Sequence, residues 1–275
     1  MTRSNDIFSA FFEIQLGNYF HNRELLNIVM DSLNIILKRN AHRKGLFWYQ
    51  CLLSNLIYDN LYLIIMGAKF CDNFVNLLYD SPSDKCLKIL DIDPGYGIFS
   101  LLYGNICSSE MSWLSYSNIQ KVEQDYADSI NTKYPVKRIL GELQNPEFDL
   151  SEKYDLIVFC EVLEHFKYYP VQTMKKIAGW LNDGGQIFLS TPTRSGDPCR
   201  IYSSYNQLPE YDINGVKVAS KTISNYLDQS EGHTHIYTKE ELFEIFSACN
   251  LSVLEYKVIN NHHRIILGSD KSTLM

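Results

Sequence analysis

Near the end of the first third of the sequence stands the run Lys88-Ile89-Leu90-Asp91-Ile92-Asp93-Pro94-Gly95-Tyr96-Gly97. It joins an apolar segment to an acidic turn with two glycines, and residues 98–103 then show a helical pattern. An apolar segment of this length predicts a buried strand. In doubly wound sheets, ligands bind where such strands end, and glycine there lets the backbone approach a ligand closely. The run therefore predicts an α/β fold with a ligand site at the turn, with a tight turn that binds nothing as the plainer alternative.

Other apolar segments follow this one and alternate with helical patterns. They cover residues 119–123, 136–140, 154–160, 186–191, 251–259 and 262–268. Strands that alternate with helices predict a mostly parallel sheet that is covered on both faces. The last two segments are separated by only two or three residues, so they should form an antiparallel hairpin at one edge. The sequence thus predicts a doubly wound, seven-stranded, mostly parallel sheet.

Two helix boundaries carry clear local signals. One helix should begin near Tyr169-Pro170, since proline fits a first helical turn, and should end at the glycines of residues 182–185. A second helix should begin at Thr238, because its hydroxyl and the Glu241 carboxylate form the pattern of a capping box.

The first 82 residues have a different character from the rest. Apolar residues recur at helical spacing over 24–39, and residues 46–78 are also helical in character. Pro82 then interrupts the pattern. We therefore expect a helical N-terminal cap over 1–82 and an α/β domain over 83–275. Within that domain, the long connection 194–232 is expected to act as a lid, and it contains Tyr202, Tyr205, Tyr211 and Tyr226.

Charge and cysteine content restrict the partners and the compartment. The formal net charge is −7 and the pI is near 5.5, which disfavours a broad phosphate-binding surface. The seven cysteines are scattered, with no C-x-x-C pair, and are expected to be reduced thiols in the cytoplasm. The N-terminus has no signal-peptide profile, and polar residues interrupt the apolar segment 46–68. We expect a cytoplasmic protein without a nucleic-acid or membrane partner, and we leave the oligomeric state open, a homodimer included.

The acids of the first turn discriminate between candidate cofactors. Asp91 and Asp93 would repel the pyrophosphate of a dinucleotide by like charge. They would attract S-adenosylmethionine, which carries a sulfonium and an ammonium group. The turn therefore favours S-adenosylmethionine over a dinucleotide.

At these residues the sequence resembles the class I S-adenosylmethionine-dependent methyltransferases, whose first motif is an acid followed by G-x-G-x-G. Asp91, Gly95 and Gly97 match the motif, and Asp93 stands at the family's first glycine. The resemblance implies a Rossmann-like methyltransferase fold. Later segments resemble the family's further motifs in the same order, and the resemblance covers roughly residues 87–268.

The resemblance also implies a set of cofactor contacts. An acid that ends the second strand would bind the ribose hydroxyls, and this is Glu123, with Asp125 as the alternative. The residues after the third strand would lie near the adenine. The fourth motif begins in the strand 154–160 and continues through His165. The implied cofactor is S-adenosyl-L-methionine, without a metal, and the implied contacts are Asp91, Asp93, Gly95, Gly97, Glu123, Glu142, Leu143, Cys160 and Glu161.

Histidines near the ends of the strands suggest an oxygen acceptor. Methyl transfer depends mainly on the alignment of nucleophile, methyl group and sulfur. A hydroxyl acceptor must also lose its proton, and histidine is the natural base. His165 follows the fourth strand, and His235 precedes the capped helix, as a similar histidine does in the ubiquinone-biosynthesis O-methyltransferases. We expect both to be catalytic, His233 being a weaker candidate, in methyl transfer to a small molecule; a nitrogen acceptor is the second choice.

Two other functions remain open at this stage. In metal-dependent RNA ribose methyltransferases an E-x-x-E-H motif and a later histidine bind a divalent ion, and Glu161, Glu164, His165 and His235 could be mapped onto that set. The acidic charge argues against this function. The second alternative is a non-catalytic protein that retains the fold, which Asp93 in place of glycine would favour.

Overall fold

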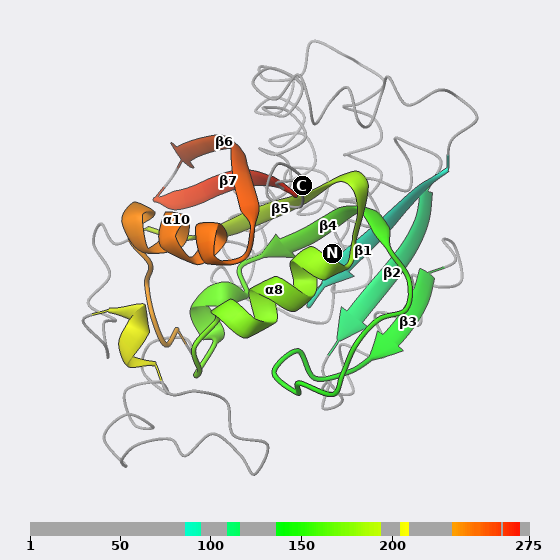
Figure 1. Cartoon of the computed structure of the whole chain (residues 1–275), viewed down its shortest axis with the longest axis horizontal. Helices are drawn as coiled ribbons and strands as arrows, with labels where there is room; N and C mark the ends of the chain where they lie inside the picture. The colour runs from blue at the N-terminus through cyan, green and yellow to red at the C-terminus, as the bar shows by residue number, and fades with distance from the viewer. Residues whose placement is uncertain are drawn as a thin grey trace, which may run out of the picture. The chain divides into compact units, whose positions relative to one another are not determined.

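The computed structural model of the 275-residue chain describes residues 86–94, 109–115, 136–193, 204–208, 233–259 and 261–269 (Figure 1). The chain divides into two compact units, and the second, residues 88–93, 112–118 and 138–275, contains the groups discussed below. The expected cap 1–82, the helix 98–103 and most of the connection 194–232 lie outside the described residues. The domain boundary near residue 82 therefore stays a prediction.

In the described part of the chain, seven strands form one sheet: β1 (Leu87–Ile92), β2 (Ser109–Ser115), β3 (Val136–Leu140), β4 (Tyr154–Cys160), β5 (Leu181–Pro192), β6 (Leu251–Ile259) and β7 (His262–Ser269). Their order is β3-β2-β1-β4-β5-β7-β6. β1 pairs in parallel with β4, and β4 with β5, whereas β7 runs antiparallel to both β5 and β6. The expected seven-stranded, mostly parallel sheet with a hairpin at one edge is confirmed.

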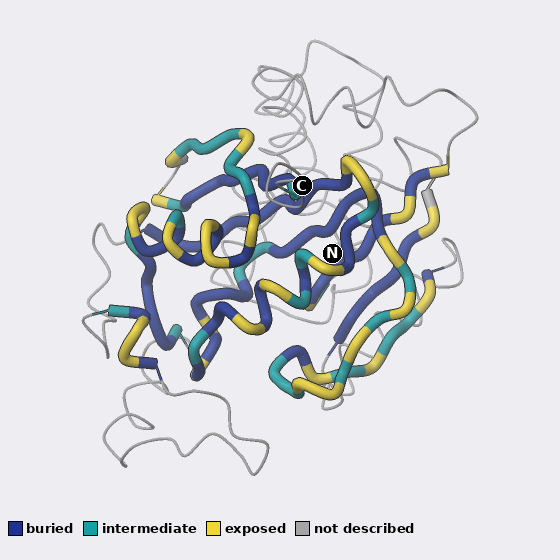
Figure 2. Tube along the Cα trace, viewed as in Figure 1, coloured by how far each residue is buried: buried dark blue, intermediate teal, exposed yellow. Residues whose placement is uncertain are grey.

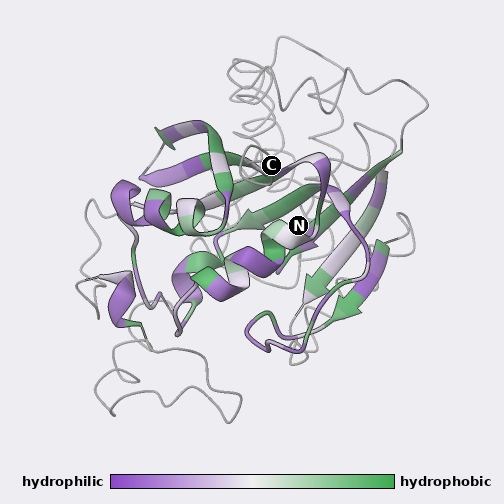
Figure 3. Cartoon of the chain, viewed as in Figure 1, coloured by the Kyte–Doolittle hydropathy of each residue, from purple (hydrophilic) through white to green (hydrophobic). Residues whose placement is uncertain are grey.

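Two helices, α8 (Val171–Gly179) and α10 (Lys239–Ala248), lie on the same face of the sheet (Figure 1). α8 is amphipathic, with Met174 and Ile177 fully buried and Lys175 exposed, and Figure 3 shows the two sides of the helix in different colours. Short 3₁₀ turns form at η2 (Leu163–His165) and η3 (Tyr205–Gln207). No helix in the described segments has the length and apolar character that a bilayer crossing requires.

The core is built around β4, which is buried along nearly its whole length (Figure 2). Ile157 and Phe159 have no exposed surface, as expected for a central strand with neighbours on both sides. Trp180, at the end of α8, is 1% exposed, and its indole N–H donates to Asp149 Oδ1 at 2.6 Å. Burial of a large apolar side chain of this kind stabilises the fold by about 1.5 to 3 kcal/mol.

The position predicted for the second strand, residues 119–123, lies outside the described residues, and β2 covers Ser109–Ser115. Its serines weaken the apolar pattern, yet Trp113 and Leu114 are buried, and the structure also buries Ser112. Burial on a central strand therefore prevails over the local composition of the segment.

The end predicted for α8 is wrong. The helix ends at Gly179 with Trp180 as its C-cap, and residues 182–185 belong to β5. Tyr154 pairs with Leu181 and Leu156 with Gln186, so that the residues between them bulge out of the ladder. Gly184 has φ +77° there, a conformation that glycine adopts without steric cost. The glycines thus allow a bulge in the strand rather than a helix cap.

Candidate active site

Four strands bring their functional residues to one edge of the sheet. β1, β4 and β5 are parallel, so their carboxyl ends meet there. β7 is antiparallel to β5, and the register pairs Ser190 with Arg264 and Pro192 with His262. The beginning of the last strand therefore lies at the same edge as the ends of the others. This edge is where doubly wound sheets bind their ligands.

The turn after β1 has the backbone conformation that normally calls for glycine. Asp93 has φ +54°, and its N–H donates to the carbonyl of Leu114 in β2 at 2.9 Å. Among residues with a side chain, aspartate and asparagine tolerate this left-handed region best. Asp93 can therefore replace a glycine here without changing the direction of the chain. Asp91, two residues earlier, is 2% exposed.

The segment after β3 is held close to the sheet. The N–H of Gly141 donates to the carbonyl of Ser115 at 3.1 Å, and a Cβ atom at Gly141 would lie 2.2 Å from the ring of Phe148. Glu142, which follows, is exposed, whereas Leu143 is 1% exposed. An exposed carboxylate beside a buried leucine is compatible with the adenine contacts that the sequence predicts.

Glu161 is the best-organised acid at this edge. It follows β4 with φ +55°, and its Oε1 accepts a hydrogen bond from Ser190 Oγ at 2.6 Å. The Arg264 guanidinium lies 3.4 Å from Oε1, and His262 Nε2 lies 3.3 Å from Oε2. Burial opposes ionisation, but the hydrogen bond from His262 and the charges of His262 and Arg264 lower the pKa of Glu161. The site therefore contains a fixed, ionised carboxylate.

Cys160, beside this acid, is a poor nucleophile. Its thiol contacts the carbonyl oxygen of Phe188 at 3.9 Å. Burial raises the pKa of Cys160 well above its usual value, so the thiol stays protonated. Its predicted role as a cofactor contact rests on its position at the end of β4.

Glu164, by contrast, is a buried acid that favours its neutral form. Its side chain has no exposed surface, and its Oε2 accepts a hydrogen bond from Thr191 Oγ1 at 3.0 Å. Burial, followed by the negative charge of Glu161, raises the pKa of Glu164 well above its usual value. Its backbone carbonyl accepts hydrogen bonds from the N–H groups of Thr234 at 2.7 Å and His235 at 3.2 Å. Glu164 thus holds the segment before α10 against the end of β4.

Three groups that could bind a divalent cation or share a proton lie together. His165 Nε2 is 4.0 Å from Glu164 Oε1, and the rings of His165 and His233 are 5.0 Å apart. Ligand atoms of Glu164, His165 and His233 lie within 4.8 Å of one another. The His165 side chain is 41% exposed and therefore accessible. This set differs from the four metal ligands mapped from the sequence, because it does not include Glu161 and because His233 takes the place of His235.

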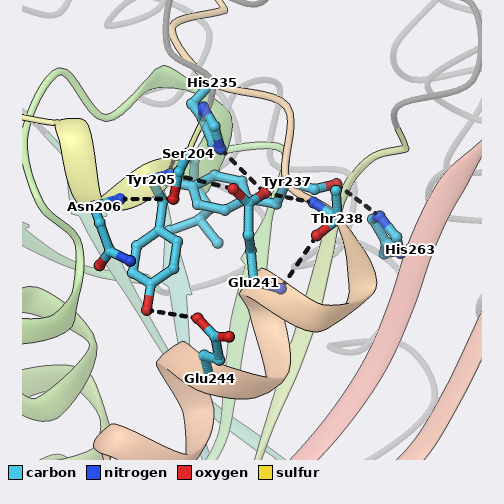
Figure 4. A network of polar contacts seen from close by, with 10 residues as sticks. Ser204, Tyr205, Asn206, His235, Tyr237, Thr238, Glu241, Glu244 and His263 are labelled. Carbon is cyan, nitrogen blue, oxygen red and sulfur yellow. Dashed lines mark hydrogen bonds and ion pairs between the residues drawn. The ribbon is translucent and has the colours of Figure 1, made fainter.

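His235 is fully buried and interacts with the cap of α10 (Figure 4). Its Nε2 lies 3.2 Å from Glu241 Oε2, and in the described part of the chain its Nδ1 has no hydrogen-bond partner. The capping box predicted from Thr238 and Glu241 is confirmed, with the Thr238 N–H donating to Glu241 Oε2 at 2.8 Å. The catalytic role of His235 stays a prediction, and the geometry gives it a structural one.

Glu241 also binds a segment of the long connection. The N–H of Tyr205 donates to Glu241 Oε1 at 3.2 Å, and the Tyr205 hydroxyl donates to Glu244 at 3.2 Å (Figure 4). Burial opposes ionisation of Glu241, but hydrogen bonds from His235 and Thr238 lower its pKa to about 2. One carboxylate therefore joins a helix cap, a histidine and residues 204–208.

Several predicted site residues are brought together and others cannot be placed. Asp91, Asp93, Cys160 and Glu161 lie at the carboxyl ends of β1 and β4, as expected. Gly95, Gly97, Glu123 and Asp125 lie outside the described residues, and Glu123 comes eight positions after the end of β2. Ser190, His262 and Arg264 also belong to this site, although the sequence did not predict them. The predicted antiparallel hairpin was the signal that could have identified His262 and Arg264, because it places the first residues of β7 beside the carboxyl end of β5.

The described residues fit a cofactor that carries positive charge. The side chains of His262 and Arg264 are bound to the Glu161 carboxylate, so they are not free to bind a phosphate group of a ligand. Asp93 is exposed in the turn after β1, and Glu142 is exposed after β3. A pyrophosphate would be repelled by these acids, whereas a sulfonium and an ammonium group would be attracted.

Comparison with known proteins identifies relatives of the chain. Residues 62–256 match a protein family described as a methyltransferase domain. The ubiquinone biosynthesis O-methyltransferase of Proteus mirabilis strain HI4320 is 28% identical over 108 residues, which is 39% of this chain and 43% of that protein. The chain thus matches less than half of the length of this curated relative.

Solved structures share the fold at low sequence identity. An S-adenosylmethionine-dependent methyltransferase from Mesorhizobium loti superposes with a TM-score of 0.50 at 12% identity, covering 70% of this chain and 96% of that one. A proposed sarcosine dimethylglycine methyltransferase from Galdieria sulphuraria gives a TM-score of 0.52 at 12% identity, covering 75% and 86%.

Proposed function

The chain belongs to the methyltransferase domain family, and from this membership we propose that it transfers the methyl group of S-adenosyl-L-methionine to a hydroxyl oxygen of a small molecule. The observation that carries the proposal is the ionised Glu161 carboxylate, which Ser190, His262 and Arg264 hold at the ligand edge of the sheet. The similarity to an O-methyltransferase over part of the chain supports the choice of oxygen.

Each predicted cofactor residue has a distinct task in this proposal. Asp91 and Asp93 would attract the positively charged methionine end, and Cys160 and Glu161 would lie beside it. Glu142 and Leu143 would contact the adenine. Gly95 and Gly97 would allow the backbone to approach the cofactor closely. Glu123 would bind the ribose. When bound, S-adenosyl-L-methionine supplies a methyl group on a sulfonium, which is an activated leaving group.

His165 is the proposed acceptor of the hydroxyl proton. The acceptor oxygen forms the new bond to the methyl carbon, the sulfur keeps the electron pair of the broken bond, and His165 takes the proton. His165 suits this role because its side chain is 41% exposed, whereas that of His235 is fully buried.

The charge of the chain and its free thiols favour a small-molecule acceptor in the cytoplasm. A net charge of −7 favours a small acceptor over a nucleic acid. Cys86, Cys160 and Cys249 are free thiols, which suits the reducing cytoplasm. We expect the N-terminal cap 1–82 and the connection 194–232 to cover the acceptor and exclude water.

Methyl transfer can be tested directly with S-adenosylmethionine that carries a tritiated methyl group. The full chain is incubated with a panel of small phenols and alcohols, with matched amines, and with total RNA as a third arm. We expect label in an oxygen ether. Label in RNA would refute the small-molecule proposal, and label in the amines alone would refute oxygen. Failure of calorimetry to detect S-adenosylmethionine binding would favour the non-catalytic alternative.

A further inference from the structure

A cavity of about 320 Å³ opens between α8 and the connection that follows β3. Residues 141–153 join β3 to β4 with turns and no helix, although such connections usually carry a helix that covers the sheet. The cavity lies beside this irregular segment. Its lining includes Gln144 from the connection and Tyr168, Tyr169, Gln172, Thr173 and Lys176 from α8 and the turn before it.

The cavity is separate from the acids and histidines that follow β4, but it borders Glu142 and Leu143, the predicted adenine contacts. Among the described residues, none of Glu161–His165 lines it. The closest link is the Thr173 hydroxyl, which donates to the carbonyl of Leu143 at 3.5 Å. A ligand in this cavity would therefore lie between α8 and the segment that follows β3, and it would not contact His165, the proposed base.

The charge of the lining is positive. Lys176 is the charged residue among the described lining residues, and its Nζ donates to the carbonyl of Asn145 at 2.7 Å. An ammonium group has three N–H donors, so it can bind a further acceptor. Asp149 lies near Lys176 but accepts from the indole of Trp180. Glu142, 3.5 Å from the amide of Gln144, is exposed.

Two tyrosines, Tyr168 and Tyr169, line the cavity. Tyr168 is 5% exposed, and its hydroxyl oxygen lies 3.3 Å from that of Thr173, within hydrogen-bonding distance. Tyr169 stacks on Tyr205, with ring centroids 5.7 Å apart and an angle of 10° between the planes. Both rings are thus fixed before any ligand arrives, which lowers the entropic cost of binding.

We propose that this cavity binds a small planar carboxylic acid. Its carboxylate would pair with Lys176 and the amide N–H groups of Gln144 and Gln172, and its ring would lie against Tyr168 and Tyr169. A volume near 320 Å³ is at the lower end of the range for small-molecule sites, which suits a single ring with one or two substituents. This proposal does not depend on the methyltransferase activity.

The test uses benzoate as the probe and benzamide as its uncharged counterpart, with the full chain and ligand-observed NMR titration. We expect benzoate to bind more tightly than benzamide. Lys176→Gln should weaken benzoate binding about fivefold or more, because a charge-assisted hydrogen bond is lost. Lys175→Gln, an exposed neighbour on the same helix, is the matched control and should leave benzoate binding unchanged.

A second variant covers the case in which Lys176→Gln disturbs the connection through Asn145. Gln172→Glu places a carboxylate in the lining at an exposed position and should weaken benzoate but not benzamide. Binding of benzoate that neither variant alters would overturn the proposal, as would no binding at millimolar concentration. Displacement of benzoate by S-adenosylhomocysteine would also overturn it, because the cavity would then belong to the cofactor site.

Discussion

The Arg264 guanidinium lies 3.4 Å from the Glu161 carboxylate, although the two residues are 103 positions apart in the sequence. Arg264 comes from the last strand of the sheet and Glu161 from the end of β4. The pair therefore joins the antiparallel edge of the sheet to its parallel centre, at the place where the cofactor is proposed to bind.

Removal of Arg264 should destabilise the fold because it leaves the partly buried Glu161 carboxylate without one of its two counter-charges. Arg264→Gln is expected to lower the free energy of unfolding by about 1.5 to 3 kcal/mol. Urea unfolding measures this loss. Lys257→Gln in β6 is the control, since the Lys257 side chain is 36% exposed whereas that of Arg264 is 6% exposed, and the loss should stay below about 1 kcal/mol. Equal losses in the two variants would contradict the organising role of Arg264.

Asp93 allows a test of the strained turn. Its φ of +54° disfavours alanine, which lacks both the polar side chain of aspartate and the freedom of glycine. Asp93→Ala should therefore be about 1 kcal/mol less stable than Asp93→Gly. Thermal unfolding of the two variants, side by side with the wild type, measures the difference. A more stable alanine variant would show that the turn does not require the left-handed conformation.

Glu241 should make stability depend on acid pH. Its pKa is lowered from 4.5 to about 2 in the folded chain, so its carboxylate stabilises the fold fully above pH 4.5 and this contribution is lost as the pH falls towards 2. Glu241→Gln should cost about 1 to 3 kcal/mol near pH 7, and the difference from the wild type should shrink below pH 4.5.

The matched control for that measurement is Glu244→Gln. It lies one turn along α10 and removes a hydrogen bond to Tyr205 while the cap stays intact. It should cost less than Glu241→Gln at pH 7. A Glu241→Gln deficit that is the same at pH 3 and pH 7 would show that ionisation of Glu241 is not its source.

The two candidate catalytic histidines should respond differently to substitution. His165→Gln should lower the turnover of an oxygen acceptor about a hundredfold to ten-thousandfold, with little change in cofactor affinity. The wild-type rate should fall as the pH drops through a histidine pKa, because a protonated imidazole cannot accept the proton, and His165→Gln should lose this limb. His235→Gln should keep the limb and unfold at a lower temperature, because Glu241 loses its partner. The reverse result in both variants would transfer the base role to His235.

Metal chelation separates a base from a metal ligand at His165. The proposal includes no metal, so EDTA should leave the methylation rate unchanged. Loss of activity that Mn²⁺ or Mg²⁺ restores would mean that Glu164, His165 and His233 bind a cation. His233→Gln would then be as damaging as His165→Gln.

Local signals made part of this structure predictable from the sequence. The strand that leads to Asp93 and the capping box at Thr238 both depend on residues that are close in the chain. β2 was not predicted because its serines dilute the apolar pattern, and its burial depends on neighbouring strands. The glycines after α8 correctly predicted an unusual backbone conformation. They were wrongly assigned to the end of the helix, because their place in a bulge of β5 is set by pairing with β4.

The acids of the candidate site could be predicted from the sequence, but their partners from β5 and β7 could not. The acids at the ends of β1 and β4 follow directly from the motif order. The partners of Glu161 come from β5 and β7, and only the register between antiparallel strands places Arg264 and His262 beside it. The burial of His235 could not be predicted either, because it results from packing against Glu241 and the carbonyl of Glu164.

The antiparallel course of β7 also affects the order in which a growing chain can complete the site. On the ribosome, Asp91 and Glu161 emerge well before His262 and Arg264, so Glu161 stays without its counter-charges until the last strand of the sheet has been made. A nascent chain stalled before residue 262 would have the sheet centre with an unneutralised acid at its edge. Cofactor binding by such stalled chains should therefore appear abruptly, once the last strand has left the exit tunnel.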